Sequence, residues 1–134
     1  MKPILKTVKR VKALSTCSVL PLVSVSNLRS ILPKIDNFKT DVLKRSIDIC
    51  LLSEVWEKEG NKKHANEIVK MMEIDGLKYI STPRPSKQRG GGCAIVVNLV
   101  KYSLEKIEIS IPHKLEVVYG LVRPKNAAFS ARFR

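Results

Sequence analysis

The stretch Ile47-Asp48-Ile49-Cys50-Leu51-Leu52-Ser53-Glu54-Val55-Trp56 decides the fold of this chain. Five of its first six residues are apolar or cysteine, two of them are β-branched, and polar residues follow at once. A short apolar run of this kind is typical of a strand that is buried on both faces. The stretch therefore predicts a strand over residues 47–53 that ends where the carboxylate of Glu54 comes free.

Other periodic segments place this strand in a larger pattern. Residues 18–25 alternate and are rich in β-branched side chains, which predicts a first strand that ends beside Asn27. Apolar positions at helical spacing predict one helix from Ser30 to about Arg45, and another from about Ala65 that stops near Gly76. Further strands are expected over residues 79–82, 92–98, 103–109 and 115–122. The pattern predicts a single domain of the α+β class.

Oxygen-bearing side chains follow the first two predicted strands at the point where each ends. Magnesium prefers hard oxygen ligands and often takes only one or two carboxylates, so Glu54 at a rigid strand end is a candidate ligand. Asn27 could offer its amide oxygen to a metal or to water. The alternative is a surface glutamate and an asparagine that simply begins a turn.

A basic, glycine-rich segment precedes the predicted strand at 92–98. Arg84, Lys87 and Arg89 lead into Gly90-Gly91-Gly92. Glycine lets a backbone approach a phosphodiester closely, and arginine can hold its oxygens with two hydrogen bonds. The segment is also compatible with a flexible connection between strands, because three glycines alone are weak evidence of phosphate binding.

Three motifs in this order resemble the N-terminal half of the endonuclease/exonuclease/phosphatase family, in the variant carried by non-LTR (LINE-type) retrotransposons. They are N-x-R-S at residues 27–30, L-S-E-x-W at residues 52–56, and the arginine-containing stretch from Pro83 that ends in G-G-G-C-A-I at Ile95. The resemblance covers about residues 19 to 126 of the 134.

The resemblance implies a four-layer α/β/β/α sandwich, of which residues 18–126 would form the first half. It implies a magnesium-dependent hydrolysis of DNA phosphodiesters, with which the full enzyme nicks DNA to prime reverse transcription. Glu54 and Asn27 would then hold Mg²⁺. The residues expected to contact nucleic acid, DNA or alternatively RNA, are Arg29, Arg84, Lys87, Arg89 and Arg123.

Motifs of the family's second half are missing from these residues. The family carries a G-D-x-N motif and a final Asp-His pair there, which hold the leaving group and activate water, and phosphodiester hydrolysis needs such a base. Val122 also stands where the family often has a phosphate-contacting tyrosine. No catalytic residue is assigned, and we expect the chain to be inactive alone and to need a complementary C-terminal half.

The net charge of +13 is concentrated at the two ends of the chain. Residues 1–13 hold five basic side chains and no acidic one, and residues 123–134 hold four and no acidic one. A basic surface fits a nucleic-acid partner, because neutralised phosphates supply most non-specific affinity. Solvated tails of no function explain the same charge. The alternative to a nuclease fragment is therefore a small basic protein that binds nucleic acid without cutting it.

The two ends lie outside the resemblance. Ile4, Leu5, Val8, Val11 and Leu14 recur at helical spacing, but the segment is rich in valine and lacks a clear cap. Residues 1–17 are therefore expected to be a disordered or loosely helical basic extension, and residues 127–134 a basic tail. A phosphatase-type member acting on a small phosphoester is a third interpretation, which the basic loop disfavours.

Cysteine usage and hydropathy indicate the compartment. Cys17, Cys50 and Cys93 are far apart and odd in number, which argues against a disulfide framework and for a reducing compartment. No apolar run reaches the ~18 residues that a membrane span needs. We expect an intracellular protein, nuclear or cytoplasmic, with His64 and His113 on its surface.

Overall fold

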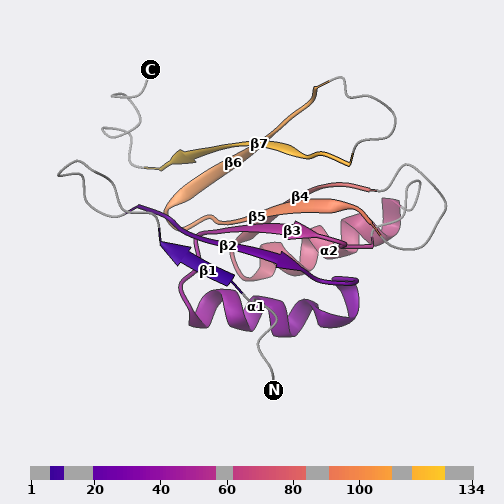
Figure 1. Cartoon of the computed structure of the whole chain (residues 1–134), viewed down its shortest axis with the longest axis horizontal. Coiled ribbons are helices and arrows are strands. Elements are labelled where there is room, and N and C mark those ends of the chain that lie inside the picture. The colour runs from indigo at the N-terminus through magenta and orange to yellow at the C-terminus, as the bar shows by residue number, and fades with distance from the viewer. Residues whose placement is uncertain (1–6, 11–19, 57–61, 84–90, 110–115, 126–134) are drawn as a thin grey trace.

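The computed structural model describes residues 7–10, 20–56, 62–83, 91–109 and 116–125. Its strands form a five-stranded sheet in the order β1-β2-β3-β5-β4 and a two-stranded sheet of β6 and β7. The helices α1 and α2 cover one face of the larger sheet, and β6–β7 lies over the other (Figure 1). The bounds are β1 Thr7–Arg10, β2 Leu22–Asn27, α1 Ile35–Lys44, β3 Ile49–Ser53, α2 Lys62–Ile74, β4 Leu77–Thr82, β5 Cys93–Asn98, β6 Tyr102–Ile107 and β7 Tyr119–Pro124, with a 3-10 turn at Leu32–Lys34. The predicted α+β class is confirmed.

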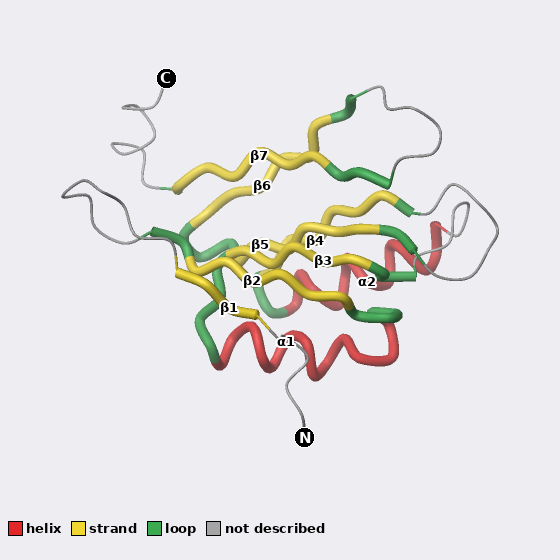
Figure 2. The backbone as a smooth tube through the Cα atoms, viewed as in Figure 1, coloured by secondary structure: helices red, strands yellow, loops and turns green. Residues whose placement is uncertain are grey.

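The pairing of strands brings several chain segments together along one edge of the larger sheet. This edge is formed by the ends of strands and not by an outer strand. β2 and β3 are parallel neighbours joined through α1, and Asn27 lies opposite Ser53 at their C-terminal ends. β5 is antiparallel to β3 and begins at this same edge, where Cys93 pairs with Ser53. β4 ends there as well, because Thr82 pairs with Cys93. In Figure 2 the green loops after β2 and β3 meet at this edge.

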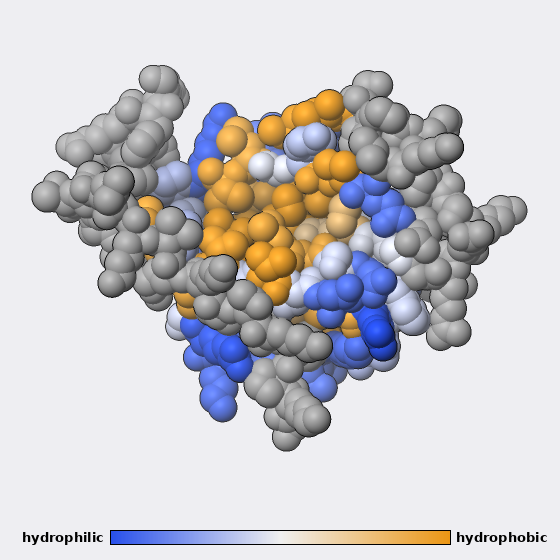
Figure 3. All heavy atoms as spheres, in the orientation of Figure 1, coloured by the Kyte–Doolittle hydropathy of each residue, from blue (hydrophilic) through white to orange (hydrophobic). Residues whose placement is uncertain are grey.

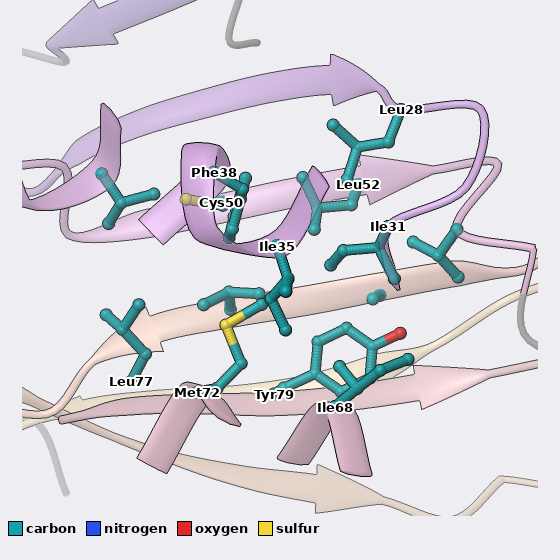
Figure 4. Close-up of a cluster of buried hydrophobic side chains, with 14 of the residues drawn as sticks. Leu28, Ile31, Ile35, Phe38, Cys50, Leu52, Ile68, Met72, Leu77 and Tyr79 are labelled. Carbon is teal, nitrogen blue, oxygen red and sulfur yellow. The ribbon is translucent and has the colours of Figure 1, made fainter. Parts of the chain in front are cut away.

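One face of the sheet packs against the helices and forms the main core. Alternate residues of β3 and β5 point to this face, and Cys50, Leu52, Ala94 and Val96 are all buried there. Phe38 of α1 is fully buried among them, so that truncating it to alanine would cost about 3–5 kcal/mol of stability. Figure 4 shows the central part of this cluster, with Leu28, Ile31, Ile35, Phe38, Cys50, Leu52, Ile68, Met72, Leu77 and Tyr79.

The other carboxylate in the stretch that decides the fold, Asp48, lies at the opposite end of β3 from Glu54. Asp48 is buried, and its Oδ2 accepts a hydrogen bond of 2.8 Å from the backbone N–H of Leu22. Its carbonyl accepts another of 2.9 Å from the N–H of Asn98. Asp48 thus joins the start of β2 to the end of β5, which explains a carboxylate inside an otherwise apolar run.

The second face of the sheet is covered only in part. Ile80 of β4, Val97 of β5 and Leu104 of β6 form a smaller buried cluster between the two sheets. Gly120 of β7 allows this close approach, because a Cβ there would lie 2.9 Å from Leu104 Cδ1. Over β2 and β3 the face is open, and the side chains of Val25 and Leu51 are 55% and 40% exposed.

A groove of about 330 Å³ runs along this open part. It is lined by Val25, Leu51 and Ile95 of the larger sheet and by Glu116–Val118, the segment that leads into β7. Figure 3 shows the apolar surface between the two sheets in orange. The five-stranded sheet thus exposes an apolar strip beside the two-stranded sheet that covers the rest.

Several expectations about the elements need correction. Residues 7–10 are not part of a disordered or loosely helical extension, because they form β1, which pairs antiparallel with β2 from Thr7↔Val25 to Arg10↔Leu22. Pairing satisfies backbone groups along the outer edge of β2, and this outweighs the helical spacing of the apolar residues. The last strand begins at Tyr119 and continues through Pro124, several residues later than expected.

The described residues supply three layers, namely helices, the five-stranded sheet and the two-stranded sheet (Figure 1). Among them no helix is both long enough and apolar enough to cross a membrane. Of the two predicted ends, residues 1–6, 11–17 and 127–134 lie outside the described residues.

Candidate metal and nucleic-acid site at the strand ends

Three loops meet at the edge where β2 and β3 end and β5 begins. We call this the strand-end rim and define it as residues 27–31, 53–56 and 91–92. Its first two loops continue the parallel pairing of β2 and β3 beyond the strands. The N–H groups of Leu28 and Ser30 donate to the carbonyls of Ser53 and Glu54 at 3.0 and 2.8 Å, and the N–H of Ile31 donates to Val55 O at 3.1 Å.

The third loop holds the second one from the other side. The N–H of Val55 donates to the carbonyl of Gly92 at 3.3 Å, and the N–H of Trp56 donates to the carbonyl of Gly91 at 2.9 Å. Gly91 and Gly92 are buried and have φ values of 70° and 80°. Glycine adopts this left-handed conformation without steric cost, whereas other residues do not. The glycine run therefore serves here as a backbone support for the Glu54 loop.

Left-handed backbone is concentrated at the rim. Of the five non-glycine residues with positive φ in the described part of the chain, four are Arg29, Ser30, Glu54 and Trp56. Each such residue costs on the order of 1–3 kcal/mol and persists only where its surroundings hold it. Backbone strain of this kind is frequent at functional sites, because the strained geometry presents a side chain that relaxed backbone would not.

The two predicted metal ligands lie at adjoining strand ends. Asn27 ends β2 and pairs with Ser53, and Glu54 follows Ser53 directly. Asn27 is exposed and Glu54 is half-buried, so both are accessible from solvent. One carboxylate and one amide oxygen suit Mg²⁺, which keeps several of its waters and binds through few protein ligands. The described residues contain no cluster of three or more His, Cys, Asp or Glu that could hold a metal more tightly.

The residues predicted to contact nucleic acid are not all in one place. Arg29 is exposed at the rim, two residues after Asn27. Arg84, Lys87 and Arg89 lie outside the described residues. The segment that contains them joins Thr82 to Gly91, and both of these ends are at the rim edge because Thr82 pairs with Cys93.

Arg123 lies at the opposite end of the molecule. It pairs with Ser103 at the start of β6, and the N–H of Lys125 donates to the carbonyl of Lys101 in the turn after β5. A strand of the length of β5 separates this end from the rim by roughly 17–20 Å. Arg123, Lys101 and Lys125 are exposed there. The structure therefore separates Arg123 from Arg29, the other predicted contact that it describes.

Two charged residues outside the rim contact its backbone and have no local signal in the sequence. Lys34 donates from its Nζ to the carbonyls of Leu28 and Arg29, so a cation closes the loop that follows Asn27. Glu116 accepts a hydrogen bond of 3.2 Å from the N–H of Gly92 through its Oε2. Glu116 is 24 residues from Gly92 in sequence, and only the tertiary fold brings them together.

The pKa values of two cysteine thiols are raised, that of Cys93 beside the rim and that of Cys50 in the core. Burial raises the pKa of the Cys93 thiol, and the nearby carboxylate of Glu116 raises it further, against a smaller opposite effect of Lys106. Burial raises the pKa of Cys50 to about 12, so this core thiol is neutral at physiological pH. His64, expected on the surface, is half-buried on α2, and His113 lies outside the described residues.

Comparison with known proteins finds no relative of this chain. No protein-family model matches the chain, and no curated protein or solved structure does either.

Proposed function

We propose that this chain is the metal-binding, N-terminal half of a magnesium-dependent DNA endonuclease domain of the endonuclease/exonuclease/phosphatase type, related to those of non-LTR retrotransposons. The observation that carries the proposal is the juxtaposition of Asn27 and Glu54 at the ends of two parallel strands. In this proposal Glu54 and the amide oxygen of Asn27 hold Mg²⁺, which when bound would neutralise charge on a phosphate oxygen. Arg29 would orient the phosphodiester by pairing with its oxygens.

The layer order supports the proposed sandwich. Two sheets already lie face to face, with the helices on the outer face of the larger one (Figure 1). The smaller sheet leaves the apolar side chains of Val25 and Leu51 exposed over β2 and β3. In the proposal, a complementary half of the domain would cover this strip and supply the second layer of helices.

Among the described residues, those that form the rim include no histidine that could activate water. The G-D-x-N motif is absent from the sequence, His64 lies on α2, and His113 lies outside the described residues. Hydrolysis would therefore need a base from the complementary half. The proposed activity of the isolated chain is binding of metal and DNA, with no cutting.

Reconstitution tests the proposal. The chain is joined, in cis or as a second polypeptide, to a C-terminal half of a family endonuclease, and nicking of supercoiled DNA is measured with and without Mg²⁺. We expect nicking only with both halves and Mg²⁺, and its loss in Glu54→Gln. Efficient nicking by the 134-residue chain alone would overturn the division into halves, and nicking that survives Glu54→Gln would overturn the site.

A second function is favoured by the basic end opposite the rim. Lys101, Arg123 and Lys125 are exposed on adjoining segments there, and they could contact phosphates without any metal. DNA binding that is unaffected by Glu54→Gln and is never accompanied by nicking would favour this non-catalytic interpretation.

A further inference from the structure

The segment that precedes β7 contacts the rim. The segment Glu116–Val118 leads into β7 and lies across the beginning of β5. Glu116 Oε2 accepts the N–H of Gly92 at 3.2 Å, and the backbone of Val118 makes a hydrogen bond to the thiol of Cys93. Gly92 and Cys93, at the start of β5, thus both contact the segment that precedes β7.

Gly92 occupies a central position in the hydrogen bonds of the rim. Its N–H is held by Glu116, while its carbonyl accepts the N–H of Val55 at 3.3 Å. The carbonyl of Glu54 in turn accepts the N–H of Ser30 at 2.8 Å. A series of backbone hydrogen bonds therefore runs from Glu116 through Gly92 and the Glu54 loop to the loop that follows Asn27.

This series explains how the rim keeps its left-handed backbone. Glu54 has a φ of 52° and Gly92 a φ of 80°. A non-glycine residue such as Glu54 relaxes from this conformation unless neighbouring groups hold it. The side-chain oxygen of Glu116 supplies an acceptor for the Gly92 N–H, and Glu116 is half-buried, where solvent competes less.

We propose that Glu116 is a positioning residue for the Glu54 site, acting through Gly92 to hold the loop that presents the Glu54 carboxylate. The inference rests on the proposed function only in naming Glu54 as a metal ligand. The positioning itself concerns the backbone of Gly92 and Val55, and it can be measured without metal or DNA.

Three variants of the whole chain separate the alternatives. Glu116→Ala removes the acceptor. Glu116→Gln keeps an acceptor oxygen at the same reach and removes the charge. Glu105→Gln removes an exposed glutamate of β6 and serves as the matched charge control. Hydrogen exchange of individual backbone amides is followed by NMR, and Mn²⁺ affinity is measured by titration.

In Glu116→Ala we expect exchange at Gly92, Val55 and Trp56 to speed up by roughly tenfold or more, since the loop loses its support. Amides in the middle of β3, such as that of Cys50, should exchange as before. Glu116→Gln and Glu105→Gln should stay near the parent chain at all these positions. Unchanged exchange at Gly92 and Val55 in Glu116→Ala, or an equal acceleration throughout the sheet, would overturn the positioning role.

The Mn²⁺ titration tests the consequence for the metal. Supporting residues typically contribute 10–100-fold to metal affinity, so Glu116→Ala should weaken Mn²⁺ binding by roughly tenfold, and Glu116→Gln should restore it. A Gln variant as weak as the Ala variant would show that the charge of Glu116 acts on the metal directly and would overturn the proposal. Absence of Mn²⁺ binding at Glu54 in the parent chain would instead overturn the proposed function, while the amide exchange would still decide the role of Glu116.

Discussion

Glu54 is held in a conformation that few glutamates adopt, and the reason lies in its neighbours. Its backbone has a φ of 52°, and hydrogen bonds fix it between the loop after β2 and the glycines before β5. A side chain on relaxed, extended backbone would alternate to one face of the sheet. Because Glu54 adopts a left-handed conformation instead, it does not continue the alternation of β3, and it lies at the strand end beside Asn27.

The pairing of Asn27 with the Glu54 loop could be predicted from sequence, whereas the residues that hold the two loops could not. Both loops follow apolar runs separated by one helix, and such runs form parallel strands whose ends meet at one edge. Lys34 and Glu116 act on backbone groups of other segments. No spacing in the sequence reports a contact across 24 residues between a glutamate and a glycine N–H.

The two described thiols should react very differently at alkaline pH. The thiolate is the reactive form, and burial raises the pKa of Cys50 from 9.0 to about 12. In a Cys17→Ser background we expect Cys50 to stay unmodified by an alkylating reagent until the protein unfolds. Cys93 should react slowly, and faster in Glu116→Gln, because the carboxylate that raises its pKa is gone.

Mass spectrometry after timed alkylation checks this expectation. The free energy of unfolding should also fall at alkaline pH. The neutral buried thiol of Cys50 stabilises the fold below pH 9, and this contribution is lost as the pH rises toward 12. Rapid modification of Cys50 in the folded chain, or no response of Cys93 to Glu116→Gln, would contradict the burial and the charge contact described above.

At the scale of elements, the helices are joined to each other through a buried cation. Lys39 of α1 is only 9% exposed, and its Nζ donates to the carbonyl of Met71 at 2.9 Å and lies 3.0 Å from Asp75 Oδ2. Met71 is in the last turn of α2, where carbonyls lack helical partners and the helix dipole favours a positive charge. The contact fixes the end of α2 against α1.

Lys39→Met tests this contact, because methionine keeps the apolar stem and removes the ammonium. We expect the free energy of unfolding to fall by about 1.5–3 kcal/mol, the range for hydrogen bonds to charged groups. Lys44→Met at an exposed position of the same helix should change it by less than about 0.5 kcal/mol. Equal effects of the two variants in urea denaturation would mean that the Lys39 contacts do not stabilise the fold.

The bounds of two strands are determined by tertiary pairing and not by the local sequence pattern. β1 lies in a segment whose apolar residues recur at helical spacing, yet it pairs with the edge of β2 as a strand. β7 continues into Pro124, which lacks an N–H, because an edge strand tolerates proline at its end. The helices α1 and α2 agree with the sequence, since their own apolar pattern matches the face on which they pack. β3 forms where the apolar run predicts it, but the expectation that both of its faces are buried is wrong, because Leu51 on its second face is 40% exposed.

On the scale of the whole molecule, the two sheets differ in width, and the wider one is left partly uncovered. Val25 and Leu51 line the open groove beside Glu116–Val118. An exposed apolar strip on a sheet promotes association with another surface. The same feature that supports the proposal of a complementary half also predicts that the isolated chain self-associates.

Leu51→Lys should reduce binding of a fluorescent apolar dye and reduce self-association. Stability should hardly change, because this side chain is 40% exposed. Val100→Lys, at a 78% exposed position in the turn after β5, is the matched control and should leave dye binding as it was. A similar decrease in both variants, seen by dye titration and light scattering, would show that the groove is not the surface responsible.

The central claim is that Asn27 and Glu54 together bind a divalent cation at the strand-end rim. The most direct measurement is the loss of backbone NMR signals on titration with paramagnetic Mn²⁺. We expect weak binding, on the order of millimolar, with selective loss of the signals of Asn27, Ser53, Glu54 and Gly92, competition by Mg²⁺, and no selective loss in Glu54→Gln. Loss centred on another part of the molecule, or an unchanged pattern in Glu54→Gln, would contradict it.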